Sequence, residues 1–171
     1  MNTLSKDRNA AFEFCESEYF LAYKDGKLAG RVAAIINHKA NERWNCKSVR
    51  FGWIDFIDDR EVSKALLQAV EDYGKSKGMD NVVGPLGFTD MDPEGMLTWG
   101  FDQLGTMPTI YNYSYYPEHI EALDGYEIDN KYVEYKLIVP DTVPEKYAKI
   151  AAMIEKRYNL HVRKLTKKDV F

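Results

Sequence analysis

The sequence has little cysteine and no long apolar run. Its 171 residues include only Cys15 and Cys46, too few for a disulfide scaffold. No apolar stretch approaches the ~20 residues of a membrane span, and the N-terminus lacks the basic-then-apolar order of a secretory signal. We therefore expect a cytoplasmic protein with reduced thiols and no membrane partner.

An excess of positive charge is also missing. Lysine and arginine number 23 and aspartate and glutamate 27, which gives a formal net charge of −4. Binding to nucleic acid needs a basic surface to neutralise phosphates, so this balance argues against a nucleic-acid partner. Apolar residues make up 45% of the chain, enough for one hydrophobic core and too many for a disordered chain.

Common catalytic and ligand motifs are absent as well. The chain has no glycine-rich nucleotide loop, no paired-cysteine zinc motif and no acidic calcium loop. Its histidines, His38, His119 and His161, are far apart in sequence. We interpret them as solvated or capping residues, and we expect no metal.

The first regular pattern is a β-hairpin. Apolar and polar residues predict strands at 18–24 and 28–37, and Asp25-Gly26 between them is typical of a tight turn. Residues 38–47 are polar and predict an irregular connection. A central strand follows at 48–57 with apolar residues on both faces, which indicates that it is covered on both sides. Strict alternation places one group of apolar side chains on one face of the strand (Val49, Phe51, Trp53, Ile57) and a second group on the opposite face (Ile54, Phe56).

The apolar spacing then changes to that of a helix. From Val62 to Tyr73 the apolar residues recur every three or four positions, Asp58 or Asp59 can cap the start, and Gly78 can close the end. A strand at 81–86 follows, so residues 48–86 predict a parallel strand–helix–strand unit. Together with the antiparallel hairpin, this unit predicts a mixed α/β fold whose sheet is mainly antiparallel and has helices on both faces.

The rest of the chain gives weaker patterns. They predict short helices at 93–100 and 117–123, and an extended segment at the alternating Tyr111, Tyr113 and Tyr115. Two further strands are predicted at 132–139 and 160–165. Between them a Thr142–Glu145 capping box predicts the start of a long helix, and Thr166–Asp169 predicts the start of a last one. We divide the chain into an irregular segment (1–17), a main domain (18–139) and a helix–strand extension (140–171). The extension is a candidate start of a second domain, and the unfinished last helix indicates either a longer protein or a frayed end.

Two groups of residues are candidates for chemistry. Asp55 lies within an apolar strand, so it is either a functional carboxylate with a raised pKa or a strand-end residue facing water. The tyrosines at 111–116 either line a pocket or pack on the sheet, since tyrosine has an apolar body and a polar tip.

The order of these elements resembles the GNAT superfamily of acyl-CoA N-acyltransferases, and more narrowly a group of longer bacterial GNAT-like proteins. The resemblance covers about residues 18–139 and rests on four segments: FLAYKDGKLAGRVAAIIN (20–37), FGWIDFIDDREVSKALLQAVEDYGKSKGM (51–79), VGPLGFTDMDPEGMLTWGFD (83–102) and YYPEHIEALDGYEIDNKYVEYKL (115–137). It implies the transfer of an acyl group from acyl-CoA, such as acetyl-CoA, to an amine acceptor that the sequence does not identify.

The resemblance also implies roles for particular residues. Asp55 is the candidate base that takes the amine proton, and Tyr115 or Tyr116 is the candidate acid that protonates the leaving thiolate. The loop that would bind the CoA pyrophosphate at the start of the helix contains Phe56, Ile57, Arg60, Glu61 and Val62. This loop is acidic and lacks the glycines of the family, so an alternative hypothesis is a non-catalytic domain that binds a ligand or partner within a longer tandem protein. An uncovered sheet edge would favour a homo-oligomer or contact with a downstream domain.

Overall fold

The structure is a computed structural model that describes residues 3–107 and 109–166. The chain divides into two compact units, residues 1–129 and 130–171, which we describe separately. The first unit contains a four-stranded sheet in the order β1 (Cys15–Lys24), β2 (Lys27–Asn37), β3 (Ser48–Phe56) and β4 (Asn81–Val83). The first two pairings are antiparallel and the pairing of β3 with β4 is parallel, which confirms the predicted mixed and mainly antiparallel sheet.

The hairpin forms where the sequence predicts it. Asp25 and Gly26 both adopt positive φ angles, 50° and 73°, which match the right-handed twist of the flanking strands. Both strands begin before their predicted starts, and β1 extends back to Cys15. The register therefore runs unbroken from Cys15 opposite Asn37 to Ala22 opposite Gly30.

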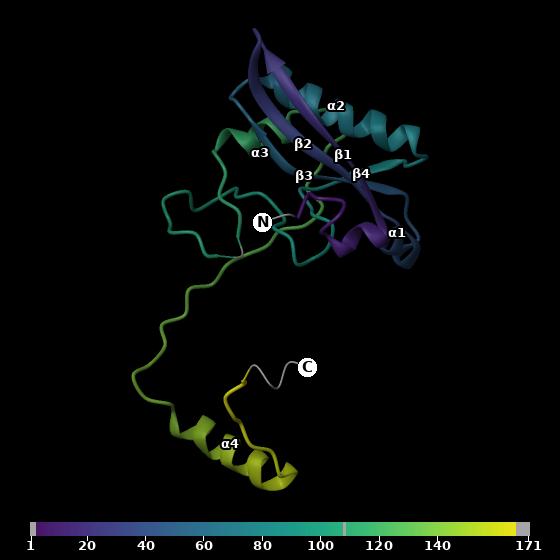
Figure 1. Ribbon diagram of the computed structural model, residues 1–171. Coiled ribbons are helices and arrows are strands. Elements are labelled where there is room, and N and C mark those ends of the chain that lie inside the picture. The colour runs from purple at the N-terminus through teal and green to yellow at the C-terminus, as the bar shows by residue number, and fades with distance from the viewer. Residues whose placement is uncertain (1–2, 108, 167–171) are drawn as a thin grey trace. The chain divides into compact units, whose positions relative to one another are not determined.

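The long helix α2 (Arg60–Ser76) covers one face of the sheet (Figure 1). Its apolar side packs into the main core, where Leu66, Leu67 and Val70 are each at most 2% exposed. Asp59 caps the start, and Gly78 lies just beyond the end with a φ of 76°, as the sequence predicts. Burial of this apolar stripe stabilises the helix more than its intrinsic propensity does.

A bulge in β3 changes the faces that strict alternation predicts. Ala33 lies opposite Gly52 but Arg31 lies opposite Asp55, so β3 has one extra residue at this point. Trp53 occupies it with a φ of 45°. Beyond the bulge the alternation is inverted. Our assignment of the two faces is therefore wrong: the side chains before and after the bulge share the core beneath α2 (Val49, Phe51, Ile54, Phe56), while Trp53 lies in the cluster on the opposite face.

That opposite face is covered by the 3-10 helix η1 (Ala10–Glu13) and by Phe88, which is completely buried. Phe12 and Trp53 pack on Phe88 with ring centroids 4.9 and 5.5 Å away. The prediction of a central strand covered on both sides, with helical segments on both faces, is therefore confirmed.

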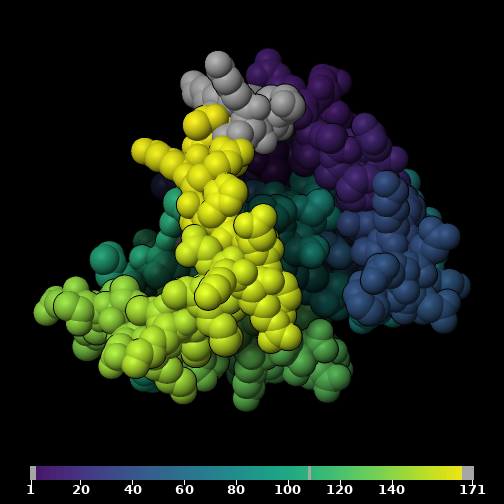
Figure 2. Space-filling view, turned by 90° about the horizontal axis from the view of Figure 1, so that it is seen from below, coloured from purple at the N-terminus to yellow at the C-terminus, as the bar shows by residue number. Residues whose placement is uncertain are grey.

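Residues 38–47 are not the irregular connection that we predict, because α1 (His38–Trp44) forms there. Asn37 caps it by accepting a hydrogen bond from the Ala40 amide, and Asn45 ends it in the left-handed conformation with a φ of 50°. The helix buries none of its residues, so it has no apolar period to reveal it. Figure 2 shows α1 beside the N-terminal segment, where the Lys39 ammonium lies 4.4 Å from the centre of the Phe14 ring.

The parallel strand β4 is shorter than predicted, because regular pairing with β3 ends at Val83. The Leu86 amide still donates to the Phe51 carbonyl, and the chain then leaves the sheet. Residues 93–100 form no helix. The helix that we predict at 117–123 is α3 (Tyr115–Glu121), which begins two residues earlier and takes Tyr115 out of the predicted extended segment.

The second unit contains α4 (Glu145–Tyr158), which confirms the predicted long helix. The capping box does not form: the helix starts after Pro144, without a side-chain cap. The strands predicted at 132–139 and 160–165 are also wrong, because the described residues there have no strand partner and a strand requires one. Of the predicted helix start at Thr166–Asp169, all but Thr166 lies outside the described residues.

A substitution at Gly52 tests the close contact between β3 and Leu86, where the chain leaves the sheet. A Cβ at this position would lie 2.3 Å from the Leu86 carbonyl oxygen, so we expect Gly52→Ala to lower the free energy of unfolding by about 2–3 kcal/mol in urea denaturation. Gly105→Ala is the matched control, because its Cβ would meet no atom within 4 Å, and it should change stability by less than about 0.5 kcal/mol. Equal losses in the two variants would contradict the contact.

Candidate functional site

The bulge at Trp53 places Asp55 on the face of the sheet opposite α2. Its carboxylate is held from two sides: Arg31 donates to Oδ2 through Nε at 2.8 Å and lies 2.6 Å away through Nη2, and the Tyr116 hydroxyl donates to Oδ1 at 3.3 Å. The Asp55 side chain is 56% exposed. Asp55 is therefore a water-facing residue near the end of the strand, and Arg31 and Tyr116 hold its carboxylate in place.

Two tyrosines complete the end of β3. The Tyr116 hydroxyl accepts a hydrogen bond from the Phe56 amide at 3.2 Å, and the Tyr115 hydroxyl donates to the Phe56 carbonyl at 2.7 Å. Regular pairing with β4 has ended before this point, so the phenols satisfy backbone groups that a longer neighbouring strand would otherwise bind. The rings of Phe56 and Tyr116 stack with centroids 4.2 Å apart.

Burial raises the pKa of both tyrosines, and the nearby Asp55 carboxylate acts in the same direction on each. Both phenols are therefore protonated at neutral pH. The three residues that we predict to be catalytic, Asp55, Tyr115 and Tyr116, lie together around Phe56, and two of them share a hydrogen bond.

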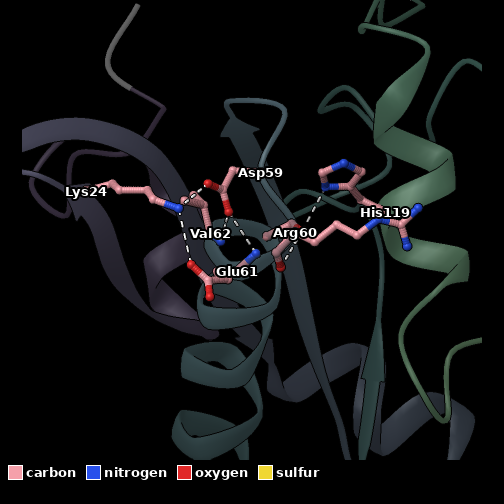
Figure 3. Close-up of polar contacts among 7 residues, drawn as sticks. Lys24, Asp59, Arg60, Glu61, Val62 and His119 are labelled. Carbon is pink, nitrogen blue, oxygen red and sulfur yellow. Dashed lines mark hydrogen bonds and ion pairs between the residues drawn. The ribbon is translucent and has the colours of Figure 1, made fainter.

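The N-terminus of α2 is occupied by a carboxylate of the chain itself. Asp59 Oδ1 accepts hydrogen bonds from the amides of Glu61 at 2.9 Å and Val62 at 3.4 Å, and Asp59 Oδ2 forms a short ion pair with Lys24 (Figure 3). Lys24 also lies 3.2 Å from Glu61 Oε2. Arg60 extends away from this group toward α3 (Figure 3). The amides that the resemblance assigns to a phosphate thus already bind an anion.

A second polar cluster lies buried beside this helix end, and the sequence did not predict it. His119 on α3 is only 4% exposed; its Nδ1 lies 3.0 Å from Ser63 Oγ and its Nε2 lies 2.9 Å from Asp58 Oδ1. Our interpretation of His119 as a solvated or capping residue is therefore wrong. A histidine two residues before the end of one helix, next to a buried serine on another helix, gives no recognisable local signal in the sequence.

Ser63 is 1% exposed, so the order serine–histidine–aspartate does not make it an accessible nucleophile. The Ser63 hydroxyl also lies 3.2 Å from the Arg60 carbonyl. This cluster joins α3 to the first turn of α2 and so positions the two tyrosines relative to the helix end. Among the described residues, no group of three or more histidine, cysteine or acidic side chains has the arrangement of a metal site.

Neither of the two cysteines is in a disulfide: Cys15 is buried and Cys46 exposed. Burial raises the pKa of the Cys15 thiol to about 11, which makes it a poor nucleophile at neutral pH. Within the part of the chain that the structure describes, no helix combines the length and hydropathy needed to cross a bilayer.

Comparison with known proteins finds two relatives. The chain is 36% identical to protein YghO of Escherichia coli K12 over 107 residues, and 31% identical to the bacterial ceramide synthase of Caulobacter vibrioides over 102 residues. These matches cover 63% and 59% of this chain but 27% of each relative, so the chain spans about a quarter of the length of the curated relatives it matches. No family model and no solved structure matches. The name of the second relative points toward acyl transfer.

The Tyr116 hydroxyl offers a direct test of the site geometry. Tyr116→Phe removes the acceptor of the buried Phe56 amide, and an unsatisfied buried donor costs about 1–3 kcal/mol, which we expect as a loss of unfolding free energy in urea. Tyr113→Phe is the matched control, because Tyr113 is 67% exposed, and its effect should be below about 0.5 kcal/mol. Equal stability of wild type and Tyr116→Phe would show that the hydroxyl contact does not hold in solution.

The Asp59–Lys24 pair predicts a pH dependence. The hydrogen bond from Lys24 lowers the pKa of Asp59, and the amides of Glu61 and Val62 act in the same direction. A carboxyl group whose folded-state pKa is depressed stabilises the fold above its ordinary pKa of about 3.9, and the stabilisation is lost as the pH falls through the lower folded-state pKa.

Thermal unfolding between about pH 2 and 7 should therefore show wild type more stable than Asp59→Asn above about pH 5, and the difference should shrink at lower pH. Asp72→Asn is the matched control, because it removes the same charge near the other end of α2, where the Asp72 carboxylate accepts a hydrogen bond from Gln68. A difference between wild type and Asp59→Asn that is constant with pH would contradict the pairing.

Proposed function

We propose that the first unit is a GNAT-like acyltransferase domain, which transfers an acyl group from acyl-CoA to an amine. The similarity to a protein named ceramide synthase supports this proposal, because a ceramide is the amide of a fatty acid and a long-chain amino alcohol. The GNAT-like order of β3, α2 and β4 supports it as well. The chain matches only about a quarter of the length of each relative. That a whole protein containing this chain is an acyltransferase is therefore also part of the proposal.

The observation that carries the proposal is the hydrogen bond between Tyr116 and Asp55 at the end of β3. Attack of an amine on a thioester releases a proton from the amine and a thiolate from CoA, so the site needs an acceptor and a donor of protons. Asp55 supplies an exposed carboxylate as the base. Tyr115 and Tyr116 hold their protons at neutral pH, and we assign the donation to the thiolate to one of them.

The donor molecule would lie with its pyrophosphate at the first turn of α2, near Phe56, Ile57, Arg60, Glu61 and Val62. In the structure the amides of Glu61 and Val62 bind Asp59 instead. The pyrophosphate would therefore have to displace this carboxylate, and Lys24, released from Asp59, would then provide a positive charge beside it. Arg60 is a cation in the first turn of α2 itself, and its side chain, which extends toward α3 in the structure (Figure 3), would have to turn to reach the pyrophosphate.

A second candidate function has an observation of its own. The first turn of α2 is already satisfied by Asp59, and a further anion would face the negative charges of Asp59 and Glu61. This arrangement favours the alternative of a GNAT-like domain that binds a partner or ligand without catalysis.

An acyl-transfer assay separates the two functions. The chain is incubated with acetyl-CoA or palmitoyl-CoA and sphinganine, amide formation is followed by mass spectrometry, and binding of each acyl-CoA is measured by calorimetry. We expect amide formation, and a loss of about 10²–10⁴-fold in kcat/KM for Asp55→Asn, the range of general-base catalysis. Asp102→Asn, an exposed residue whose carboxylate accepts from Gln103, is the control and should retain full activity.

Binding of acyl-CoA without turnover would favour the non-catalytic function. Neither binding nor turnover would contradict the proposal for this chain. In that case Asp59→Asn decides whether the cap is responsible, because it keeps the amide-accepting oxygen and removes the charge that opposes the pyrophosphate.

A further inference from the structure

His119 on α3 is a buried titratable side chain that has no role in the proposed acyl transfer. Its ring lies between Asp58, in the loop before α2, and Ser63, in the first turn of that helix. Histidine is the side chain whose charge changes most readily between pH 5 and 8. A buried histidine at this place can therefore couple the start of α2 to the binding of a proton.

The contacts around the ring determine where its protons lie. The carboxylate of Asp58 only accepts hydrogen bonds, so His119 Nε2, which lies 2.9 Å from Asp58 Oδ1, carries a proton. The Ser63 hydroxyl has one proton and two neighbours, the Arg60 carbonyl at 3.2 Å and His119 Nδ1 at 3.0 Å. The protonation of Nδ1 therefore decides which neighbour receives the hydroxyl proton.

Two arrangements fit these contacts. When the ring is charged, Nδ1 donates to Ser63 Oγ and the Ser63 hydroxyl donates to the Arg60 carbonyl, so all three contacts are hydrogen bonds. When the ring is neutral, Ser63 donates to Nδ1 instead and the Arg60 carbonyl loses this donor. The charged ring thus makes every contact that the structure shows, and it also neutralises Asp58.

The groups packed around His119 act differently on its charge. Asp58 favours the charged ring, whereas the Arg60 side chain, which extends toward α3 (Figure 3), opposes it. The rings of Phe56 on β3 and Tyr115 on α3 both have centroids 5.4 Å from that of His119. Burial raises the pKa of Tyr115, so its phenol stays neutral in this pH range. Asp58 and Arg60 are therefore the charges that compete at this ring.

The start of α2 has an excess of negative charge when His119 is neutral. Three carboxylates and two cations lie at this end of the helix (Asp58, Asp59, Glu61; Lys24, Arg60). Asp55, at the end of β3, is already paired with Arg31 and adds no further excess. The excess repels an anion at the first turn of α2, and one positive charge on His119 cancels it.

We propose that the binding of acyl-CoA at the start of α2 is linked to the protonation of His119. The charged ring neutralises Asp58 and so reduces the repulsion of the pyrophosphate. By reciprocity, the bound pyrophosphate favours the charged ring, so anion and proton bind together. This inference rests on the proposed function, because the anion site is the one assigned there to the acyl donor. It adds a regulation of donor binding by pH, and His119 takes no part in the transfer itself.

Calorimetry with dephospho-CoA tests the link. The pyrophosphate diester of this probe keeps its charge between pH 6 and 8, whereas the 3′-phosphate of CoA itself titrates in that range. We expect wild type to bind it about three- to tenfold more tightly at pH 6 than at pH 8, the effect of one partly screened charge. His38→Gln is the matched control and should keep this dependence, because His38 is an exposed histidine that pairs with Glu16.

Two variants of the ion pair should remove the pH dependence at opposite levels of affinity. Asp58→Asn keeps the oxygen that accepts from Nε2 and removes the negative charge, so it should bind at pH 8 as tightly as wild type does at pH 6. His119→Gln carries no charge, so at both pH values it should bind as weakly as wild type does at pH 8. The Asp58 side chain is 70% exposed, so Asp58→Asn keeps the test valid even if His119→Gln fails to fold.

The outcomes separate this link from the proposed function. Equal affinity of wild type at pH 6 and 8, or an unchanged pH dependence in Asp58→Asn, would overturn the link and leave the donor site intact. Absence of binding to both wild type and Asp58→Asn at either pH would overturn the donor site and the link together.

Nitrogen-15 NMR of the chain without ligand tests the proton positions independently of any binding. We expect a proton on Nε2 and none on Nδ1 at the upper end of the range, and protonation of Nδ1 as the pH falls from 8 to 5. The signals are assigned by comparison with His38→Gln and His161→Gln. A proton on Nδ1 with none on Nε2, or a ring whose charge is constant over this range, would overturn the hydrogen-bond arrangement and the link.

Discussion

The bulge at Trp53 is the constraint on which the rest of the first unit depends. One extra residue in β3 keeps Ile54 and Phe56 in the core beneath α2 and turns Asp55 to the opposite face, beside Arg31. Without it, Asp55 would point toward the apolar side of α2, where an unpaired carboxylate is costly. Trp53 tolerates its left-handed backbone because its ring packs on the buried Phe88. A local distortion of the strand thus creates the polar site at its end.

The end of β3 and the start of α2 form one connected unit. Regular pairing with β4 stops early, the two tyrosines of α3 bind the Phe56 backbone, and His119 on the same helix reaches Ser63 and Asp58 at the first turn of α2. Because α3 contacts both elements, the position of the candidate proton donors is coupled to the position of the candidate anion site. The Asp59 carboxylate, which caps α2 and pairs with Lys24, also belongs to this unit and places a negative charge at the start of the helix.

Local patterns were enough to predict the hairpin, the central strand, α2 and α4, since each depends on neighbours in the sequence: a turn, an alternation or an apolar stripe. They failed where the structure depends on distant partners. The segment 132–139 has the composition of a strand but no described strand beside it, and α1 forms from polar residues through caps at Asn37 and Asn45. Sequence also grouped Asp55, Tyr115 and Tyr116 as candidates, although only by resemblance, and it missed His119.

The sequence by itself determined the mixed, mainly antiparallel sheet and the helix that follows its central strand, because hydrophobic periodicity and turn residues act over a few positions. Only the tertiary structure decided which face Asp55 occupies, which groups bind the Phe56 backbone and that Lys24, some 35 residues away, holds the cap of α2. Those outcomes depend on a one-residue shift in register and on side chains brought together by packing. Neither produces a periodic pattern in the sequence.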